Sequence, residues 1–421
     1  MTLPPGFINQ MHILLGEETE EFLMAMQQSP ATSVRLNRRK PGADFPDGTP
    51  VKWCRCGVYL PQRPVFTLDP LLHAGAYYVQ DASSMIYHEV ACRLAEKFKT
   101  VSGEQQFSPL SLLDLCAAPG GKTTAMIDAL PDGSRIVANE YVARRAIILK
   151  ENIAKWGYPS VAVTNLDSSV FAENGDSFDI VAVDAPCSGE GMMRKETAAV
   201  EQWSIDLINQ CAALQKDILA NAVKAIKPGG FLIYSTCTFN RTENEENAGF
   251  IADVLGLEPV DMDFPEEWGI PRGIGTDLPV YRFMPHKTRG EGLFLAVFRK
   301  PGTWNPSNIT ASGNFRSKTS GRNDRHRGKA ISGVKPGHLR DEIPSIEEIL
   351  SIDFDRSLFP EAEVSLQQAV SYLRREAIVL PPDVPKGLVT VTYRHLPLGM
   401  AKNIGNRANN LYPKNWRILM K

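Results

Sequence analysis

Short apolar runs alternate with segments of helical spacing from about residue 110 to residue 300. Such runs are typical of buried strands, and the segments between them carry the periodicity of helices. We expect strands over residues 110–115, 135–140, 161–164, 178–183, 231–234 and 292–298. We expect helices over residues 123–130, 143–156 and 203–226. Strands that alternate with helices predict an α/β fold with a doubly wound, mostly parallel sheet.

The longest predicted helix, over residues 203–226, has an apolar face that is expected to be buried. The residues of this face are Leu207, Cys211, Leu214, Ile218 and Ala222. We expect Pro228-Gly229-Gly230 to end the helix. Before the core, residues 20–26 are predicted to form a helix, residues 33–37 a strand, and residues 75–85 a strand leading into a helix capped by Asp81 or Ser83.

Changes in composition divide the chain into four parts. We expect a small α+β segment over residues 1–74, the α/β core over 75–302, a linker over 303–340 and a small α+β module over 341–421 with a strand at 387–393. The linker is rich in Asn, Ser, Gly and Thr, and it contains the basic residues Arg316, Lys318, Arg322, Arg325, Arg327, Lys329 and Lys335. This composition predicts a flexible segment that is either a solvated tether or a contact for RNA phosphates.

Composition and charge exclude several classes of protein. Hydrophobic residues make up 43% of the 421 residues, which is too many for a disordered chain. No apolar run reaches the roughly 18–20 residues of a membrane helix, and the N-terminus lacks the features of a signal peptide. The seven cysteines are scattered, which indicates free thiols and a reducing, cytoplasmic location. The formal net charge of −2 neither supports nor excludes a nucleic-acid partner.

A glycine-rich turn follows the first strand of the core and leads into a helix. Such turns let the backbone approach a ligand at a helix N-terminus. Gly121-Lys122-Thr123 resembles the end of a phosphate-binding loop, but that motif requires glycine where this chain has Cys116. The dinucleotide pattern Gly-x-Gly-x-x-Gly is also absent from this turn. The candidate cofactor turn consists of Cys116, Ala117, Ala118, Pro119, Gly120, Gly121 and Lys122.

Two acidic residues follow the next two strands. Glu140 comes roughly 20 residues after the glycines, a position from which a carboxylate accepts hydrogen bonds from both ribose hydroxyls. Asp167 follows the third strand and is placed to accept from an adenine amino group. A glycine-rich turn with two acids fits a nucleoside without phosphates, and S-adenosylmethionine is the common cofactor of that description. The alternative is a generic α/β domain with solvated acids at its strand ends.

Two cysteines are expected at the same edge of the sheet, one beside a carboxylate. Asp184-Ala185-Pro186-Cys187 follows the strand over 178–183, and Ser235-Thr236-Cys237 follows the strand over 231–234. A thiolate that adds to C6 of cytosine makes C5 nucleophilic, so that C5 can attack a methyl sulfonium. A second thiol can help resolve the adduct, and Asp184 is placed to stabilise charge near N3. Lys122 and the neighbouring helix start are candidates for lowering a thiol pKa.

Other interpretations of these cysteines carry different consequences. A methyltransferase that acts on an exocyclic amine is expected to have an aromatic residue after its Asp-x-Pro turn, where this chain has Cys187. Cys187 and Cys237 can also be read as small buried hydrophobic residues. We interpret Cys92, Cys116 and Cys211 in that way, because their surroundings are apolar. Cys54-x-Cys56 lacks a second pair at zinc spacing, so we expect no metal.

Taken together, these motifs resemble the Sun/Fmu (Nop2-type) family of RNA cytosine-5 methyltransferases. The matching stretches occur in family order and are residues 75–85, 114–122, 139–140, Asp167, 184–191, 235–238 and 243–245. Residues 394–402 and 410–417 look like the PUA-like C-terminal module of the bacterial enzymes that modify small-subunit ribosomal RNA.

The resemblance implies a Rossmann-like S-adenosylmethionine methyltransferase core with RNA-binding N-terminal and PUA-like C-terminal parts. It implies that residues 116–122 line the cofactor largely through their backbone, that Glu140 holds the ribose and that Asp167 lies on the adenine side. It further implies that Cys237 is the nucleophile and that Cys187 assists product release; the spacing alone does not assign these two roles.

The expected function is cytosine-5 methylation in ribosomal RNA, with 16S RNA as the expected molecule and a flipped or loop cytosine as the target. One alternative keeps this chemistry and changes the substrate to tRNA. An alternative of another class is a non-catalytic RNA-binding factor in ribosome assembly, against which the retained cysteines, Asp184 and cofactor turn argue. No DNA partner and no membrane partner are expected.

Overall fold

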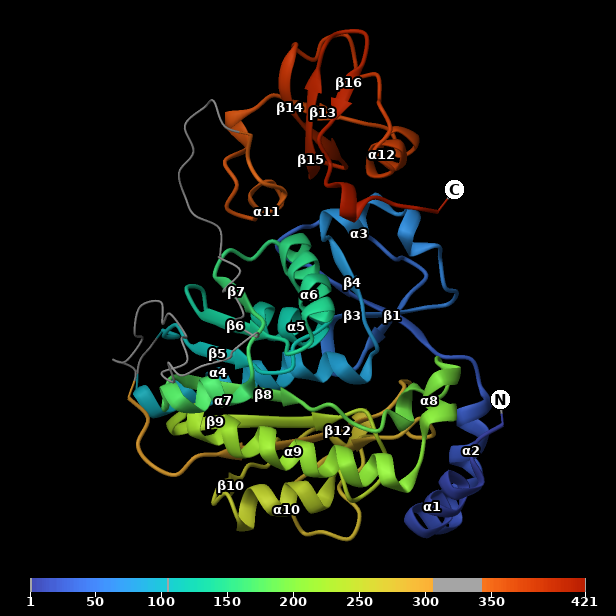
Figure 1. The fold of residues 1–421 in the computed structure, drawn as a ribbon, viewed down its shortest axis with the longest axis vertical. Helices are drawn as coiled ribbons and strands as arrows, with labels where there is room; N and C mark the ends of the chain where they lie inside the picture. Colours follow the sequence, from blue (N-terminus) through green and yellow to red (C-terminus); the bar gives the residue numbers. More distant parts are fainter. Residues whose placement is uncertain (1, 104–105, 306–342, 421) are drawn as a thin grey trace, which may run out of the picture.

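The structure, a computed structural model, describes residues 2–103, 106–305 and 343–420 (Figure 1). A sheet in the order β10-β12-β9-β8-β5-β6-β7, with β11 beside β12, forms its centre. Its strands are β5 (Ser111–Asp114), β6 (Arg135–Asn139), β7 (Val161–Thr164), β8 (Phe178–Asp184), β9 (Ile226–Thr236), β10 (Glu258–Pro259), β11 (Tyr281–Phe283) and β12 (Leu293–Arg299). Strands β5 to β9 are parallel and β10 to β12 pair antiparallel. The predicted doubly wound, mostly parallel sheet is confirmed.

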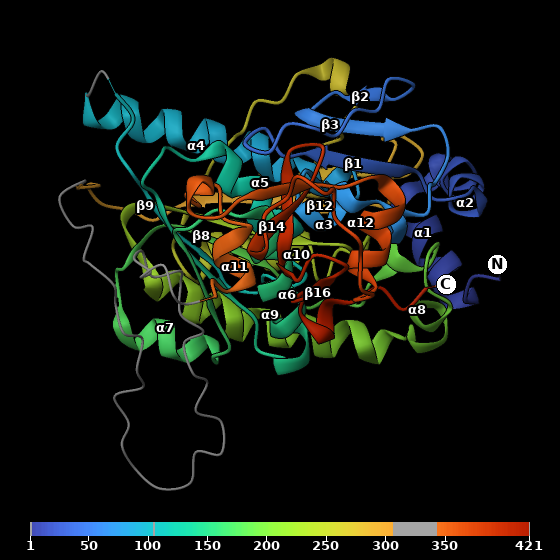
Figure 2. The same ribbon diagram turned by 90° about the horizontal axis from the view of Figure 1, so that it is seen from above.

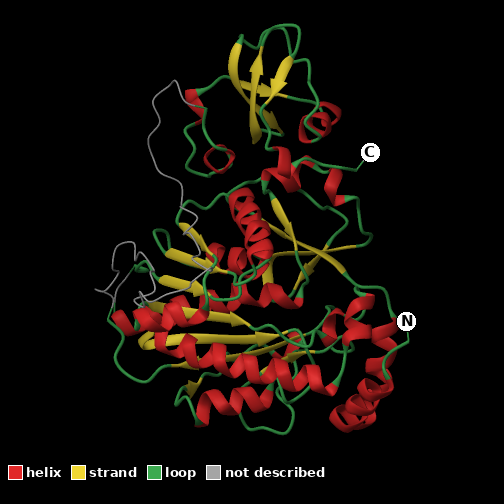
Figure 3. Ribbon diagram, in the orientation of Figure 1, coloured by secondary structure: helices red, strands yellow, loops and turns green. Residues whose placement is uncertain are grey.

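Helices cover both faces of this sheet (Figure 3). One face packs on α4 (Ile86–Ser102), α5 (Gly121–Ala129) and α6 (Ala143–Trp156), and the other on α7 (Ser168–Asn174), α9 (Ile205–Ala225) and α10 (Glu245–Asp253). From β5 the chain proceeds through β6 to β7 and then returns to β8 and β9 on the other side of β5. This reversal puts the topological switch point between the carboxyl ends of β5 and β8, the usual ligand position in such sheets.

The N-terminal part packs against the core in two separate places. Helices α1 (Pro5–Leu15) and α2 (Thr19–Gln27) share a hydrophobic cluster with Met193, Phe239 and Met284 of the core. The following residues form an antiparallel sheet in the order β2-β3-β1-β4, with helix α3 before its last strand. These elements are β1 (Thr32–Leu36), β2 (Thr49–Val51), β3 (Cys54–Leu60), α3 (Pro70–Ala74) and β4 (Tyr77–Val79).

The C-terminal module is a small sheet in the order β13-β14-β15-β16 with two short helices. Its elements are α11 (Ile346–Ile349), β13 (Glu361–Glu363), α12 (Leu366–Leu373), β14 (Gly387–Tyr393), β15 (Leu396–Asn403) and β16 (Ala408–Asn410). Val34, Leu71 and Ala74 of the N-terminal part lie in one hydrophobic cluster with Tyr372 and Leu398 of this module. The module therefore rests on α3 and its neighbours, as the view from above also shows (Figure 2).

Three local predictions are wrong. In α9 the predicted residues Ile218 and Ala222 are buried, but Leu207 and Cys211 are only partly buried and Leu214 is 48% exposed. Ile208, Ala212 and Gln215 take their places on the buried face. The chain leaves the helix at Ile226, so Pro228-Gly229-Gly230 lies inside β9 and does not end α9. Helix α4 has Met85 as its N-cap with no side-chain hydrogen bond, and Asp81 instead accepts from the backbone N of Glu291 (3.0 Å).

Two further observations concern the whole chain. None of the helices in the described ranges is both long enough and apolar enough to cross a membrane. Of the predicted basic linker, residues 306–340 lie outside the described residues.

Candidate active site

The cofactor turn connects β5 to α5 at this switch point. Gly120, with φ of +109°, is the N-cap of α5, and this left-handed backbone favours glycine. Two side chains of α6 hold the carbonyls of the turn: Arg145 donates to Ala118 O (2.9 Å) and Asn152 to Pro119 O (2.8 Å). The backbone N–H groups at the start of α5 are therefore presented on a fixed turn.

Glu140 lies beside this turn, directly after β6, and has an unsatisfied oxygen. The residue is only 3% exposed. Its Oε1 accepts from the backbone N of Val142 (2.9 Å), whereas Oε2 has no hydrogen bond and lies 3.3 Å from Nη1 of Arg145. A buried carboxylate oxygen without a hydrogen-bond donor fits a ligand that brings hydroxyl groups, as the ribose of S-adenosylmethionine does.

Asp167 is placed at the end of β7 as predicted, but its side chain is exposed and has a local structural role. Its Oδ1 accepts from the backbone N (2.9 Å) and the hydroxyl (2.6 Å) of Ser169, which makes Asp167 the N-cap of α7. Its carboxylate is thus fixed at the same edge of the sheet as Glu140.

The two predicted thiols meet at this edge. Sγ of Cys187 and Sγ of Cys237 are 3.3 Å apart, although the residues are 50 positions apart in the chain. The two loops are also joined by a hydrogen bond from Gly191 N to Cys237 O (2.8 Å) and by one between the hydroxyls of Ser188 and Thr238 (2.9 Å). The hydrogen bond with Cys237, followed by burial, raises the pKa of Cys187 well above the ordinary thiol value. Burial beside Cys237 therefore favours the protonated thiol of Cys187.

Asp184 lies next to the thiols in an ion pair. Its Oδ2 accepts from Nζ of Lys122 (2.7 Å), and its Oδ1 accepts from the hydroxyl of Ser235 (2.6 Å), which in turn contacts the hydroxyl of Tyr87 (2.8 Å). Burial lowers the pKa of Lys122, but the negative charge of Asp184 outweighs it, so the pKa of Lys122 is raised. Lys122 is thus held as a cation by Asp184, and the pKa of the Cys187 thiol is raised and not lowered.

The remaining cysteines lie away from this pair. Burial raises the pKa of Cys54 and of Cys92 to about 11, and it also raises that of Cys116. All seven cysteines are free thiols. Among the described residues, no group of three or more His, Cys, Asp or Glu side chains is placed to hold a metal ion.

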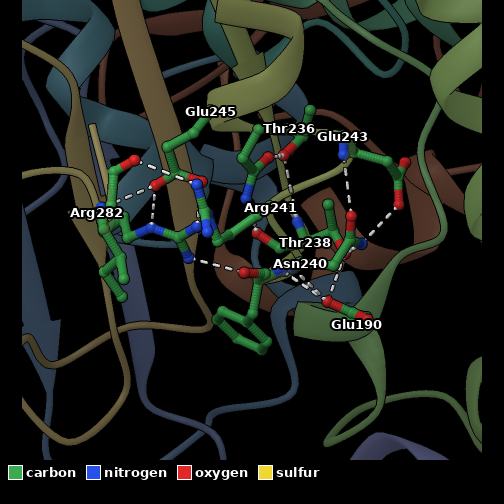
Figure 4. Close-up of polar contacts among 12 residues, drawn as sticks. Glu190, Thr236, Thr238, Asn240, Arg241, Glu243, Glu245 and Arg282 are labelled. Atoms are coloured by element: carbon green, nitrogen blue, oxygen red, sulfur yellow. Dashed lines mark hydrogen bonds and ion pairs between the residues drawn. The ribbon is translucent and has the colours of Figure 1, made fainter. Parts of the chain in front are cut away.

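Several polar residues of the site were given no role by the sequence analysis. Glu243 accepts from the backbone N of Ser188 (3.0 Å) and from Gln215 (2.7 Å), and Glu190 accepts from Thr238 (2.6 Å), as Figure 4 shows for part of this network. Both glutamates lie inside the stretches that carry the family resemblance, which was the available signal. Tyr87 lies on α4, far away in the chain, and no pattern indicated it.

Three family models match the chain. The N-terminal domain of 16S rRNA methyltransferase RsmF matches residues 3–82, 16S rRNA methyltransferase RsmB/F matches residues 104–299, and the methyltransferase RsmF PUA domain matches residues 359–418. These three matches follow the chain in the order of its N-terminal part, its core and its C-terminal module.

Curated relatives agree with the family models, and solved structures share the fold. The small-subunit ribosomal RNA methyltransferase F of Pectobacterium atrosepticum is 30% identical over 98% of this chain and 96% of its own length, and that of Salmonella heidelberg is 32% identical over the same shares. Among solved structures, NSun6 from Pyrococcus horikoshii with SFG has a TM-score of 0.58 at 20% identity, covering 70% of this chain and 98% of that chain. A methyltransferase homologue from the same organism has a TM-score of 0.57 at 24% identity, covering 71% of this chain and 100% of that chain.

Proposed function

The chain belongs to the RsmB/F family of 16S rRNA methyltransferases, and on that premise we propose that it methylates C5 of a cytosine in the RNA of the small ribosomal subunit. The family depends on S-adenosylmethionine. The observation that carries the proposed C5 chemistry is the 3.3 Å approach of the Cys187 and Cys237 sulfurs beside Asp184. A methyltransferase acting on an amine needs neither thiol, whereas ring-carbon chemistry needs a nucleophile and a means to release it.

Cys237 is the proposed nucleophile. Its thiolate forms a bond from Sγ to C6 of the cytosine, and the electron pair of the C5–C6 double bond moves toward N3. N3 takes up a proton from solvent, and the Asp184 carboxylate accepts a hydrogen bond from this N3–H, which limits the charge that develops on the ring; N3 gives the proton back to solvent when the aromatic ring is restored. The cofactor, when bound, supplies an electrophilic methyl group to C5.

Cys187 is the proposed residue for product release. After methyl transfer, C5 loses its proton to solvent, and the bond between C6 and Sγ breaks with the electron pair returning to sulfur. Because Cys187 is a protonated thiol 3.3 Å from that sulfur, it stabilises the departing Cys237 thiolate by donating a hydrogen bond. This assignment uses the raised pKa of Cys187 and would not work if Cys187 were itself the thiolate.

The cofactor site is proposed from the turn and the two acids. The backbone of residues 116–122 lines the cofactor, and Oε2 of Glu140 accepts from the ribose hydroxyls. Asp167, exposed at the same edge, lies on the adenine side. In this arrangement Arg145 supports both parts, because it contacts Ala118 O and the Glu140 carboxylate.

The parts outside the core are proposed to hold the RNA. Residues 75–302 form the catalytic core, and residues 1–74 and the PUA module within 341–421 position the RNA. This division follows the order of the family models, and the substrate places the protein in the cytoplasm.

Methylation of defined RNA tests the proposal. The purified protein is incubated with labelled S-adenosylmethionine and either small-subunit ribosomal RNA, assembled 30S subunits or tRNA, and the nucleosides are analysed by mass spectrometry. We expect 5-methylcytidine in ribosomal RNA at one position, which bisulfite sequencing identifies. Label on an exocyclic amine would contradict the C5 chemistry, and label in tRNA alone would replace the substrate.

A further inference from the structure

Glu190 is the most densely hydrogen-bonded carboxylate near the thiols, and neither the family models nor the proposed reaction gives it a task. It is fully buried. Its Oε2 accepts three hydrogen bonds from the residues that directly follow Cys237: from the hydroxyl of Thr238 (2.6 Å), from the backbone N of Phe239 (2.7 Å) and from the backbone N of Asn240 (2.9 Å). Figure 4 shows Glu190 beneath this segment, with its contacts converging on one end of the side chain.

The second oxygen of Glu190 is held from the opposite direction. Its Oε1 accepts from Nε2 of Gln10 on α1 (2.7 Å) and from Nε1 of Trp203 (2.9 Å). None of the ion pairs among the described residues involves Glu190. Five hydrogen-bond donors therefore surround the two oxygens of Glu190, an arrangement that suits a carboxylate because a carboxylate only accepts.

The position of Glu190 links the two thiol loops. It lies three residues after Cys187, and its contacts reach the three residues after Cys237. The next residue, Gly191, donates its N–H to the carbonyl of Cys237 (2.8 Å), and a Cβ added to Gly191 would lie 2.7 Å from that oxygen. The approach of the two loops is thus fixed on one side by Glu190 and Gly191.

The N-terminal helices support the same segment. Phe239 packs in a hydrophobic cluster with Phe7 and Met11 of α1 and Phe22 of α2, and the rings of Phe22 and Phe239 are 5.1 Å apart with their planes at 83°. Gln10 comes from the same helix as Phe7. The N-terminal helices therefore contact the Cys237 loop directly through the ring of Phe22, and Gln10 of α1 reaches it indirectly through Glu190.

We propose that Glu190 is a positioning residue for Cys237 and that Gln10 and Trp203 hold Glu190 in place. The N-terminal helices thereby set the geometry of the nucleophile. This inference rests on the proposed function for the role of Cys237 itself. Glu190 acts by holding residues 238–240, and it does not touch the reacting atoms. If α1 and α2 served RNA binding alone, changes in their contacts would alter the affinity for RNA. In the proposed arrangement, changes in their contacts with Glu190 alter the rate of the covalent step.

The variant Glu190→Gln tests this directly. An amide places a donor where either Oε1 or Oε2 accepts, so at least one set of partners loses its acceptor. We expect the single-turnover methylation rate at saturating RNA and cofactor to fall about 100-fold, because a shift of about 1 Å has that effect on an oriented reaction. The dissociation constants for RNA and cofactor should stay unchanged. The rate at which iodoacetamide alkylates Cys237 should change, and peptide mass spectrometry at several pH values measures this rate.

Asp179→Asn is the matched control. Asp179 is an equally buried carboxylate, with four hydrogen-bond contacts, near the opposite end of β8. The Asp179→Asn substitution should destabilise the fold. It should leave the methylation rate of the folded protein within about twofold of the wild-type rate, because distant sites act independently. If Glu190→Gln keeps the wild-type rate and alkylation profile, or if the control loses as much rate, the inference is wrong.

Two milder variants keep the test decisive should Glu190→Gln fail to fold. Trp203→Phe and Gln10→Leu each remove one donor to Oε1, and each should lower the rate with RNA affinity unchanged. Their effects should be non-additive when combined, because both act through the same oxygen; additive effects or unchanged rates would contradict the proposal. Wild-type protein that makes no 5-methylcytidine would overturn the proposed function instead, while the alkylation profiles still report on Glu190.

Discussion

Strand β8 has an aspartate near each end, and the two are held in different ways. Near the amino end, Asp179 accepts from Lys227 (2.9 Å), from Trp304 Nε1 (2.7 Å) and from the N–H and hydroxyl of Ser111 (2.7 and 2.6 Å). At the carboxyl end, Asp184 accepts from Lys122 and Ser235. The side chains of the first ion pair are 2% and 8% exposed, and those of the second 27% and 16%.

This contrast distinguishes an ion pair that stabilises the fold from one that is available to a ligand. The four donors around Asp179 use both of its oxygens and leave no access from solvent. Asp184 is oriented by its two partners and remains partly open at the edge where the cofactor turn and the thiols meet. The same residue type, five positions apart on one strand, therefore has a structural role at one end and a proposed catalytic role at the other.

The largest expected effect is on activity at the open end. Asp184→Asn removes the charge that supports the proton at N3, so the methylation rate should fall by about 10²–10⁴-fold, the usual contribution of a positioned acid or base. The free energy of unfolding should change by only about 1 kcal/mol, because the ion pair is partly exposed. Single-turnover kinetics and urea denaturation measure the two quantities, and an unchanged rate would remove Asp184 from the mechanism.

At the closed end the effect should fall on stability. Asp179→Asn leaves Lys227 buried without its counter-charge, which should lower the free energy of unfolding by about 3–5 kcal/mol. Replacing Lys227 by Met in the same protein should restore part of that loss, because the unpaired charge is then gone. Urea denaturation of the single and double variants checks this, and equal stability of wild type and Asp179→Asn would show that the ion pair is not structural.

Asp114, at the end of β5, shows what burial does to a carboxylate that takes part in none of the ion pairs among the described residues. It is 1% exposed and accepts from the hydroxyl of Thr123 (2.6 Å), and burial raises its pKa to about 7 from 3.8. Between about pH 4 and pH 7 the folded protein keeps a proton that the unfolded chain has released. Stability should therefore fall as pH rises through this window, by up to about 1.4 kcal/mol per pH unit.

Denaturation at several pH values measures that slope. Asp114→Asn should flatten it, since no proton is then exchanged at this position. A slope that is the same in the variant would assign the pH dependence to other groups.

The smallest expected effect concerns the cofactor. Glu140→Ala should weaken S-adenosylmethionine binding by about 1.5–3 kcal/mol, the range for hydrogen bonds to a charged group. The comparison variant is Asp167→Ala. It should in addition lower the free energy of unfolding by about 1 kcal/mol, because it removes the N-cap of α7. Titration calorimetry measures both affinities, and unchanged binding by Glu140→Ala would remove it from the ribose role.

The sequence predicted the scaffold well where pattern and burial agree. Helix α6 and strand β7 have the predicted bounds, and the two cysteines meet because each follows a parallel strand. The predicted buried face of α9 was wrong in its first half, because the face contains Gln215, a polar residue that donates to Pro186 O and Glu243 and interrupts the apolar pattern.

Contacts between distant segments were beyond the sequence pattern. Tyr87 reaches Ser235 from α4, and Gln10 reaches Glu190 from α1, across separations that no periodicity encodes. The protonated state of Cys187 also depends on how close Cys237 lies and how deeply Cys187 is buried, which only the folded chain determines.

Trapping of the covalent adduct tests the division of labour between the thiols most directly. Cys187→Ala and Cys237→Ala proteins are incubated with small-subunit ribosomal RNA and S-adenosylmethionine, and protein–RNA adducts are separated on a denaturing gel and located by mass spectrometry. The account predicts that Cys187→Ala accumulates an adduct through Cys237 and that Cys237→Ala forms none. An adduct in Cys237→Ala and none in Cys187→Ala would contradict it.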